Sequence, residues 1–186
     1  MKTLIVVPAR YGSTRFLGKP LTLIAGKSIV SRVAGMAGKA AAALDDAAHV
    51  VATDDARIEE HCRARGIPVV MTDPALPSGS DRALAAAEAL GVQPQVVVNL
   101  QGDSPFTTPA HIIAVAQAAM MSGADAATPY VRLSWEALDA LRAHKLETPF
   151  SGTTLTHDVN GQALWFSKII LPAMRKEAAL RAAGDL

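Results

Sequence analysis

The amino-acid sequence predicts an α/β protein with a mostly parallel sheet flanked by helices. Short apolar runs recur through the first 100 residues, and each is continuous rather than alternating with polar residues. Such runs are typical of strands that are covered on both faces, as in a parallel sheet. Helical patterns lie between the runs. This alternation of strand and helix is the signature of a doubly wound domain with right-handed crossovers.

Four runs are the predicted strands. They comprise residues 4–7 (LIVV), 50–53 (VVAT), 69–71 (VVM) and 96–100 (VVVNL). In an open α/β sheet, ligands bind beyond the carboxyl ends of the strands. The loops that follow these strands are therefore the places where we expect a functional site.

The segments between the strands carry helix signals. Ser28 is predicted to be the N-cap of a helix that runs to about residue 44. Either Asp54 or Asp55 could cap the next helix, which ends near Gly66, and we interpret Asp54 as that cap. Two further helices, each followed by a glycine, are predicted over residues 79–90 and 109–122.

The pattern changes after residue 130. A short helix is predicted over residues 135–144, and Asn160-Gly161 favours a hairpin between strands at 153–157 and 162–166. The end of the chain, residues 171–186, reads as an alanine-rich helix. We interpret residues 1–186 as a single domain with an α/β part over 1–130 and a small hairpin and helix region over 131–186.

The composition excludes several classes of protein. Lysine plus arginine number 18 and aspartate plus glutamate 17, for a formal net charge of +1. This balance gives no electrostatic argument for binding nucleic acid or an anionic membrane. The single cysteine, Cys62, excludes an intrachain disulfide and a cysteine-based zinc site. No apolar run reaches the roughly 18 residues of a membrane span, so we expect a soluble cytoplasmic protein.

The loop after the first strand is the most informative segment. Residues 8–21 read PARYGSTRFLGKPL and offer two arginines, a lysine, hydroxyls and glycines. Fixed cations and backbone N–H groups of this kind suit a polyphosphate, although a basic surface loop is the alternative reading. The loop has neither the G-x-x-x-x-G-K-[ST] pattern of a P-loop nor the G-x-G-x-x-G pattern of a dinucleotide-binding fold.

This loop resembles the opening signature of the sugar-activating cytidylyltransferases, P-A-R-x-x-S-T-R-L-P-G-K-P-L. The likeness is closest to the 3-deoxy-manno-octulosonate (Kdo) cytidylyltransferases. The matching residues are Pro8, Ala9, Arg10, Ser13, Thr14, Arg15, Gly18, Lys19, Pro20 and Leu21. The chain departs from the signature at Phe16-Leu17, where leucine-proline is usual.

Four further segments resemble the family's motifs, and they come in the same order along the chain. They are VATD at residues 51–54, MT with SGSDR at 71–82, NLQGDSPF at 99–106 and ALWFSK at 163–168. The resemblance implies a Rossmann-like nucleotide-diphospho-sugar transferase fold. It also implies an enzyme that activates Kdo, or a close 3-deoxy sugar acid, with CTP to give a CMP-sugar and pyrophosphate for lipopolysaccharide synthesis.

The resemblance assigns roles to particular residues. Arg10, Lys19 and Asp103 are the expected catalytic residues, with Asp103 as the ligand of Mg²⁺ and Gln101 as a contact to the sugar acid. A carboxylate suits Mg²⁺, which prefers oxygen ligands and substrate phosphates. The expected nucleotide-binding residues are Ala9, Arg10, Ser13, Arg15, Lys19, Ser80 and Arg82.

The chain also departs from the family. Ser104 stands where glutamate is common, and residues 148–154 (TPFSGTT) differ from the usual N-P-N-x-V-K-V-V. The resemblance implies that residues 1–130 bind the nucleotide and that 131–186 begin a sugar-binding and dimerisation part. Family members continue with a H-[IV]-G-x-Y-x-Y-R run and a second metal carboxylate, so we expect a truncated chain whose full-length form is a homodimer. The alternatives are a transferase for another sugar acid, such as neuraminic acid, and a CTP-binding module without turnover.

Overall fold

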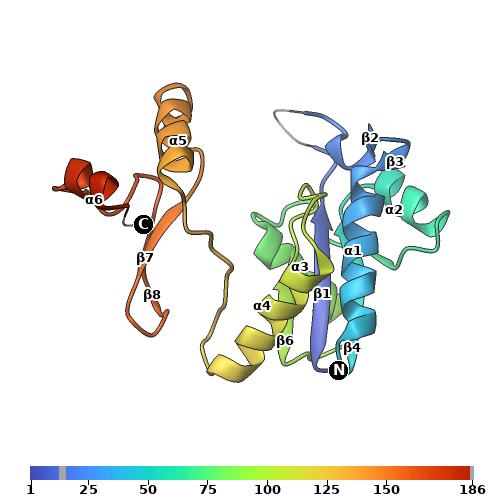
Figure 1. The fold of residues 1–186 in the computed structure, drawn as a ribbon. Coiled ribbons are helices and arrows are strands. Elements are labelled where there is room, and N and C mark those ends of the chain that lie inside the picture. Colours follow the sequence, from blue (N-terminus) through green and yellow to red (C-terminus); the bar gives the residue numbers. More distant parts are fainter. Residues whose placement is uncertain (13–15, 185–186) are drawn as a thin grey trace. The chain divides into compact units, whose positions relative to one another are not determined.

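The computed structural model describes residues 1–12 and 16–184. The chain forms two compact units, Met1–Pro129 and Tyr130–Leu186 (Figure 1). The boundary falls beside residue 130, where the sequence pattern changes. That the whole chain serves as one nucleotidyltransferase domain stays a prediction.

Unit 1 is built on a four-stranded sheet in the order β5-β4-β1-β6, and every neighbouring pair is parallel. The strands are β1 (Thr3–Ala9), β4 (Ala47–Thr53), β5 (Val69–Met71) and β6 (Val96–Asn99). All four predicted strands are confirmed, and β1 and β4 are longer than the apolar runs that predicted them. The α/β fold class is confirmed with them.

Helices cover both faces of this sheet. They are α1 (Ile29–Ala43), α2 (Ala56–Arg63), α3 (Gly79–Ala89) and α4 (Pro109–Ser122). Ile5 and Val7 pack in one buried cluster with residues of α1, α2 and α4, whereas Leu4 and Val6 pack in a second cluster with α3. Successive side chains of a strand point to opposite faces. The continuous apolar run of β1 therefore supplies both halves of the core.

The contact between α1 and α2 includes a polar cluster. Ser28 caps α1 by accepting a hydrogen bond from the backbone N–H of Ser31, as predicted. His61 of α2 lies against both hydroxyls, with its Nε2 atom 2.7 Å from Ser28 Oγ and 3.1 Å from Ser31 Oγ. Burial lowers the pKa of His61, and the nearby charge of Arg65 lowers it further.

One predicted cap is wrong. The N-cap of α2 is Asp55, whose Oδ1 atom accepts from the backbone N–H of Arg57 at 3.0 Å. Asp54 instead belongs to the end of the sheet, as described below. Sequence analysis also missed three short elements after the first loop: η1 (Lys19–Leu21), β2 (Leu23–Ile24) and β3 (Lys27–Ser28).

Unit 2 contains α5 (Trp135–Glu147), an antiparallel hairpin of β7 (Thr154–His157) and β8 (Ala163–Ser167), and α6 (Glu177–Ala183). The hairpin confirms the expectation from Asn160-Gly161. The last helix begins later than predicted. Its N-cap residue, Lys176, makes no side-chain capping hydrogen bond.

Polar contacts hold the elements of unit 2 together. The Lys145 ammonium of α5 lies within hydrogen-bond distance of the backbone carbonyls of Pro149, Ser151, Gly152 and Lys168, which share its three N–H groups. Arg142 pairs with Glu177 at 2.7 Å. Hydrogen bonds from Arg142 and Arg181 lower the pKa of Glu177 to about 2. Among the residues described in both units, no helix is long and apolar enough to cross a membrane.

Candidate active site

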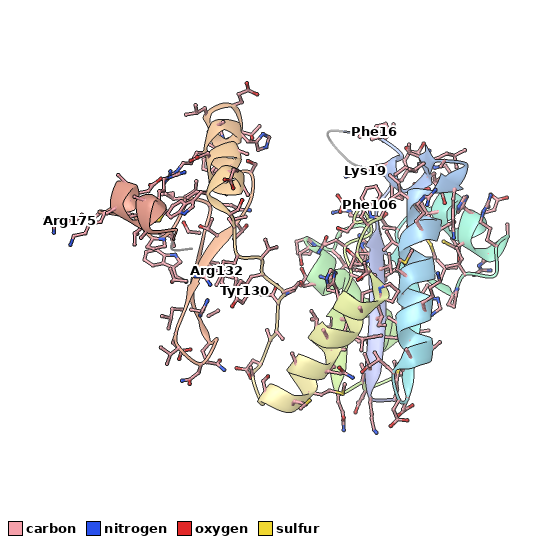
Figure 2. All side chains as sticks on the ribbon, viewed as in Figure 1. Phe16, Lys19, Phe106, Tyr130, Arg132 and Arg175 are labelled. Atoms are coloured by element: carbon pink, nitrogen blue, oxygen red, sulfur yellow. The ribbon has the colours of Figure 1, made fainter. Side chains whose placement is uncertain are left out.

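The carboxyl ends of the four parallel strands bring together polar residues that are distant in the sequence. Arg10 follows β1, Asp54 follows β4, Thr72 follows β5 and Asp103 lies in the loop after β6. The register places Ala9 beside Thr53 and Thr53 beside Met71, so Arg10, Asp54 and Thr72 leave the sheet at one level. Figure 2 shows Lys19 and Phe106 at this end of unit 1, above β1 in the view.

Lys19 and Asp103 form an ion pair. Lys19 begins η1 immediately after Gly18, whose φ of 70° lies in the left-handed region that suits glycine. The Lys19 ammonium lies 2.7 Å from Asp103 Oδ2, and both side chains are partly exposed. Two of the predicted catalytic residues therefore meet, although 84 positions separate them in the sequence.

Arg10 belongs to a second charged network. Its Nε atom donates to Asp54 Oδ2 at 3.3 Å, and its Nη2 atom donates to the carbonyl of Pro74 at 3.3 Å. The Arg82 Nη2 atom donates to the same Asp54 oxygen at 2.8 Å, and its Nη1 atom donates to Thr72 Oγ1. The Arg10 side chain is 47% exposed, whereas Arg82 is completely buried. Burial lowers the pKa of Arg82, and the Asp54 carboxylate opposes that effect.

The other predicted site residues lie in different surroundings. Ala9 is the last residue of β1, and its side chain packs in the core. Ser80 is exposed in the first turn of α3, where its hydroxyl accepts from Asn99 Nδ2 at 3.3 Å. Gln101 is exposed in the loop after β6. Ser13 and Arg15 lie outside the described residues.

The first loop closes on itself at Tyr11. The backbone N–H of Gly18 donates to the Tyr11 carbonyl at 3.0 Å. A Cβ atom at Gly18 would lie 3.0 Å from Cζ of the tyrosine ring, so a larger residue would crowd it. The guanidinium carbon of Arg57 lies 3.3 Å from the ring centroid. These contacts fix the base of the loop that carries Lys19.

Gly102 lets the loop of Asp103 pack closely against the end of β1. A Cβ atom at this position would lie 2.2 Å from the carbonyl oxygen of Pro8, so only glycine lets the two backbones approach so closely. The contact fixes the loop of Asp103 against the end of β1. Sequence analysis noted Gly102 only as part of the NLQGDSPF match. A glycine directly before the aspartate that was predicted to bind Mg²⁺ was the available signal.

The arrangement suits a polyanion. Arg10, Lys19 and Arg82 contribute three positive charges, and Asp54 and Asp103 contribute two negative ones. Within the described part of the chain, no group of three or more His, Cys, Asp or Glu side chains could hold a metal. A lone partly exposed carboxylate beside cationic residues still fits Mg²⁺, which is commonly held by one or two carboxylates together with substrate phosphates.

Comparisons with known proteins show the family of the chain. The family model described as cytidylyltransferase matches residues 4–184. The chain is 42% identical to the 3-deoxy-manno-octulosonate cytidylyltransferase of Maricaulis maris (strain MCS10) over 95% of its own length and 67% of the relative. It is 43% identical to the protein of that name from Pseudomonas syringae pv. syringae (strain B728a), with 94% and 65% covered. The chain thus spans about two thirds of the length of these relatives.

The fold is also found among solved structures. A CMP:2-keto-3-deoxy-manno-octonic acid synthetase complexed with CTP is similar with a TM-score of 0.75 and 29% identity, over 96% of this chain and 68% of that one. A cytidylyltransferase from Leptospira borgpetersenii is similar over 63% of this chain and 48% of that one, with a TM-score of 0.52 and 25% identity. The first likeness confirms the fold predicted from the sequence resemblance.

Proposed function

The chain belongs to the cytidylyltransferase family, and we propose that it transfers the cytidylyl group of CTP to 3-deoxy-manno-octulosonate, giving a CMP-sugar and pyrophosphate. The observation that carries the proposal is the similarity to relatives of that name at about 40% identity over nearly the whole chain. The cluster of Arg10, Lys19 and Asp103 at one edge of the sheet supports it.

The reaction requires a crowded triphosphate to be neutralised. A sugar hydroxyl attacks the α-phosphorus of CTP, the bond to the bridging oxygen breaks, and pyrophosphate leaves. Arg10 and Lys19 supply fixed positive charge for the phosphate oxygens, where charge develops as the leaving group departs. Asp103 would hold Mg²⁺, which supplies further charge neutralisation for the phosphates when it is bound.

We also propose a cofactor, a cellular role and an oligomeric state for the enzyme. Mg²⁺ is the proposed cofactor, and the products would serve lipopolysaccharide synthesis in the cytoplasm. The full-length protein is proposed to be a homodimer. Binding of CTP without turnover is the second candidate function of this chain. It is favoured by the fact that unit 1 alone contains Arg10, Lys19 and Asp103.

The first test is pyrophosphate release by the 186-residue chain with CTP, Mg²⁺ and Kdo. We expect release with CTP and little with ATP, GTP or UTP, and release that depends on Kdo rather than neuraminic acid. Omission of Mg²⁺ is expected to abolish the signal. Calorimetric binding of CTP with no pyrophosphate release would favour the second candidate function instead.

The second test removes the charged groups singly. Arg10→Ala and Asp103→Asn are each expected to lower kcat/KM by about 100-fold or more, as the loss of one group that stabilises a developing charge commonly does. Arg63→Ala and Asp45→Asn are the matched controls, because both side chains are highly exposed and lie away from the carboxyl ends of the strands. Unchanged rates in Arg10→Ala or Asp103→Asn would show that the site lies elsewhere.

A further inference from the structure

We propose that Asp54 is a positioning residue that fixes the Arg10 guanidinium by joining it to the buried Arg82. This inference rests on the proposed function, because it concerns how Arg10 meets the phosphates of CTP. The motif VATD drew attention to Asp54, and sequence analysis interpreted it as a helix cap. The structure gives that cap to Asp55 and leaves the Asp54 carboxylate to the two arginines.

The position of Asp54 in the sheet allows this role. It follows β4, which lies between β1 and β5, so Arg10 is on one side of it and Thr72 is on the other. Thr72 is itself tied to the end of β4, since its backbone N–H and its hydroxyl both donate to the carbonyl of Thr53. The end of β4 is therefore a fixed point between the two neighbouring strands.

The buried side of the network is the rigid side. A completely buried cation needs a paired anion, because an isolated charge in the protein interior is very unfavourable. Arg82 meets that need with the 2.8 Å hydrogen bond to Asp54 Oδ2, and Thr72 accepts from its other terminal nitrogen. Asp54 is itself only 11% exposed. The contact with Arg82 therefore fixes the Asp54 carboxylate independently of Arg10.

The exposed side of the network is the Arg10 guanidinium. Asp54 and the carbonyl of Pro74 each accept one N–H group, at Nε and Nη2. An arginine carries five N–H donors in a planar fork, so further donors remain for an anion. Orienting the plane through Nε reduces the rotamer freedom that Arg10 would lose on binding a phosphate. The second arginine also leaves this three-residue group with a net positive charge, so Asp54 does not cancel the attraction for a polyanion.

Two variants separate positioning from stability. Asp54→Asn removes the charge with little change in shape, and we expect it to raise the Kd and KM for CTP about tenfold, in line with the loss of a hydrogen bond to a charged group. It also leaves Arg82 buried without its counter-ion, which would lower stability. The double variant Asp54→Asn/Arg82→Met removes both buried charges, and such a replacement is often neutral for stability.

The double variant decides the role. If Asp54 positions Arg10, the double variant regains thermal stability while its affinity for CTP stays about tenfold weak. Wild-type affinity in the double variant would overturn the proposal, because the effect of Asp54→Asn would then be structural. Asp45→Asn is the matched control for the aspartate change. Asp45 is highly exposed, pairs with Lys2 and precedes β4, so it lies at the amino ends of the strands, away from the site.

A cycle with Arg10 gives an independent readout. In an Arg10→Ala background, Asp54→Asn should cause no further loss of CTP affinity, since the residue that it positions is gone. A further tenfold loss there would contradict the proposal.

A measurement without nucleotide separates this proposal from the proposed function. Solvent exchange of the Arg10 Nε–H, followed by NMR and assigned with Arg10→Ala, should be slow in the wild type and faster in Asp54→Asn. Equal exchange in the two proteins would overturn the positioning role. If the wild type bound no CTP while the exchange difference was present, the proposed function would fail and the link between Asp54 and Arg10 would stand.

Discussion

The residues of the site divide into those that present charge and those that hold the charge in place. The resemblance to the cytidylyltransferases predicted Arg10, Lys19 and Asp103 as catalytic residues, and the structure brings Lys19 and Asp103 into contact. The partnership of Arg82 with Asp54 could not be predicted from the sequence, because it joins a helix to a strand end across 28 positions. The resemblance placed Arg82 among the expected nucleotide-binding residues. In the structure its guanidinium is buried against Asp54 and Thr72.

Gly102→Ala tests the backbone contact beneath Asp103. The new Cβ atom would lie 2.2 Å from the carbonyl oxygen of Pro8, and neither backbone can move without disturbing β1 or the Asp103 loop. We expect a loss of about 1–3 kcal/mol in the free energy of unfolding, measured by urea denaturation, together with weaker turnover. Gly12→Ala is the control for stability, since no atom of the residues that the structure describes lies within 4 Å of a Cβ atom there. Equal stability of the two variants would contradict this account.

At the scale of the elements, the sequence predicted the strands and helices that carry the core. Continuous apolar runs and glycine stops are local signals, and they sufficed for the four strands of the sheet and the four helices around it. The β2–β3 pair was missed because two-residue strands have no periodicity to detect. The start of α6 at Glu177 was missed because its N-cap, Lys176, is not one of the residue types that usually mark a helix start.

The contact between α1 and α2 predicts a pH dependence of stability. Burial lowers the pKa of His61 and also that of His49 in β4, so both bind a proton less readily in the folded chain than in the unfolded chain. The unfolded state therefore takes up protons first as the pH falls through about 6.5. We expect the free energy of unfolding to decrease from pH 7 to pH 5.

Urea denaturation of the wild type and of His61→Gln at pH 7, 6 and 5 checks this expectation. The variant removes one of the two groups, so its stability should fall less steeply over the same range. A parallel decline in both proteins would show that His61 does not contribute to the pH dependence.

At the scale of the whole molecule, the chain consists of two units with different interiors. Both buried clusters of the core lie within unit 1, and Leu138 is the buried apolar residue identified among the described residues of unit 2. Unit 2 instead exposes large apolar side chains, including Leu164 and Ile169, and ion pairs such as Arg181 with Asp139 link its helices α6 and α5. The sequence predicted where the pattern changes, near residue 130. It could not predict this contrast in burial, which depends on tertiary packing.

This contrast predicts that unit 1 folds alone. A fragment of residues 1–129 should unfold in one cooperative thermal transition, followed by far-ultraviolet circular dichroism, because it contains the complete sheet and both core clusters. The full chain is the reference. A fragment with helical signal but no cooperative transition would show that unit 1 needs the rest of the chain.

The division into two units also determines which part of this protein intrinsic fluorescence follows. The chain has two tryptophans, Trp135 and Trp165, and both lie in unit 2. Trp135 lies under the guanidinium of Arg181, 4.4 Å from ring to cation, and Trp165 is 66% exposed. Intrinsic tryptophan fluorescence therefore follows the hairpin and helix unit. Unit 1, which carries Arg10, Lys19 and Asp103, has no tryptophan. Its one tyrosine, Tyr11 at the base of the first loop, is the residue whose fluorescence would follow that unit.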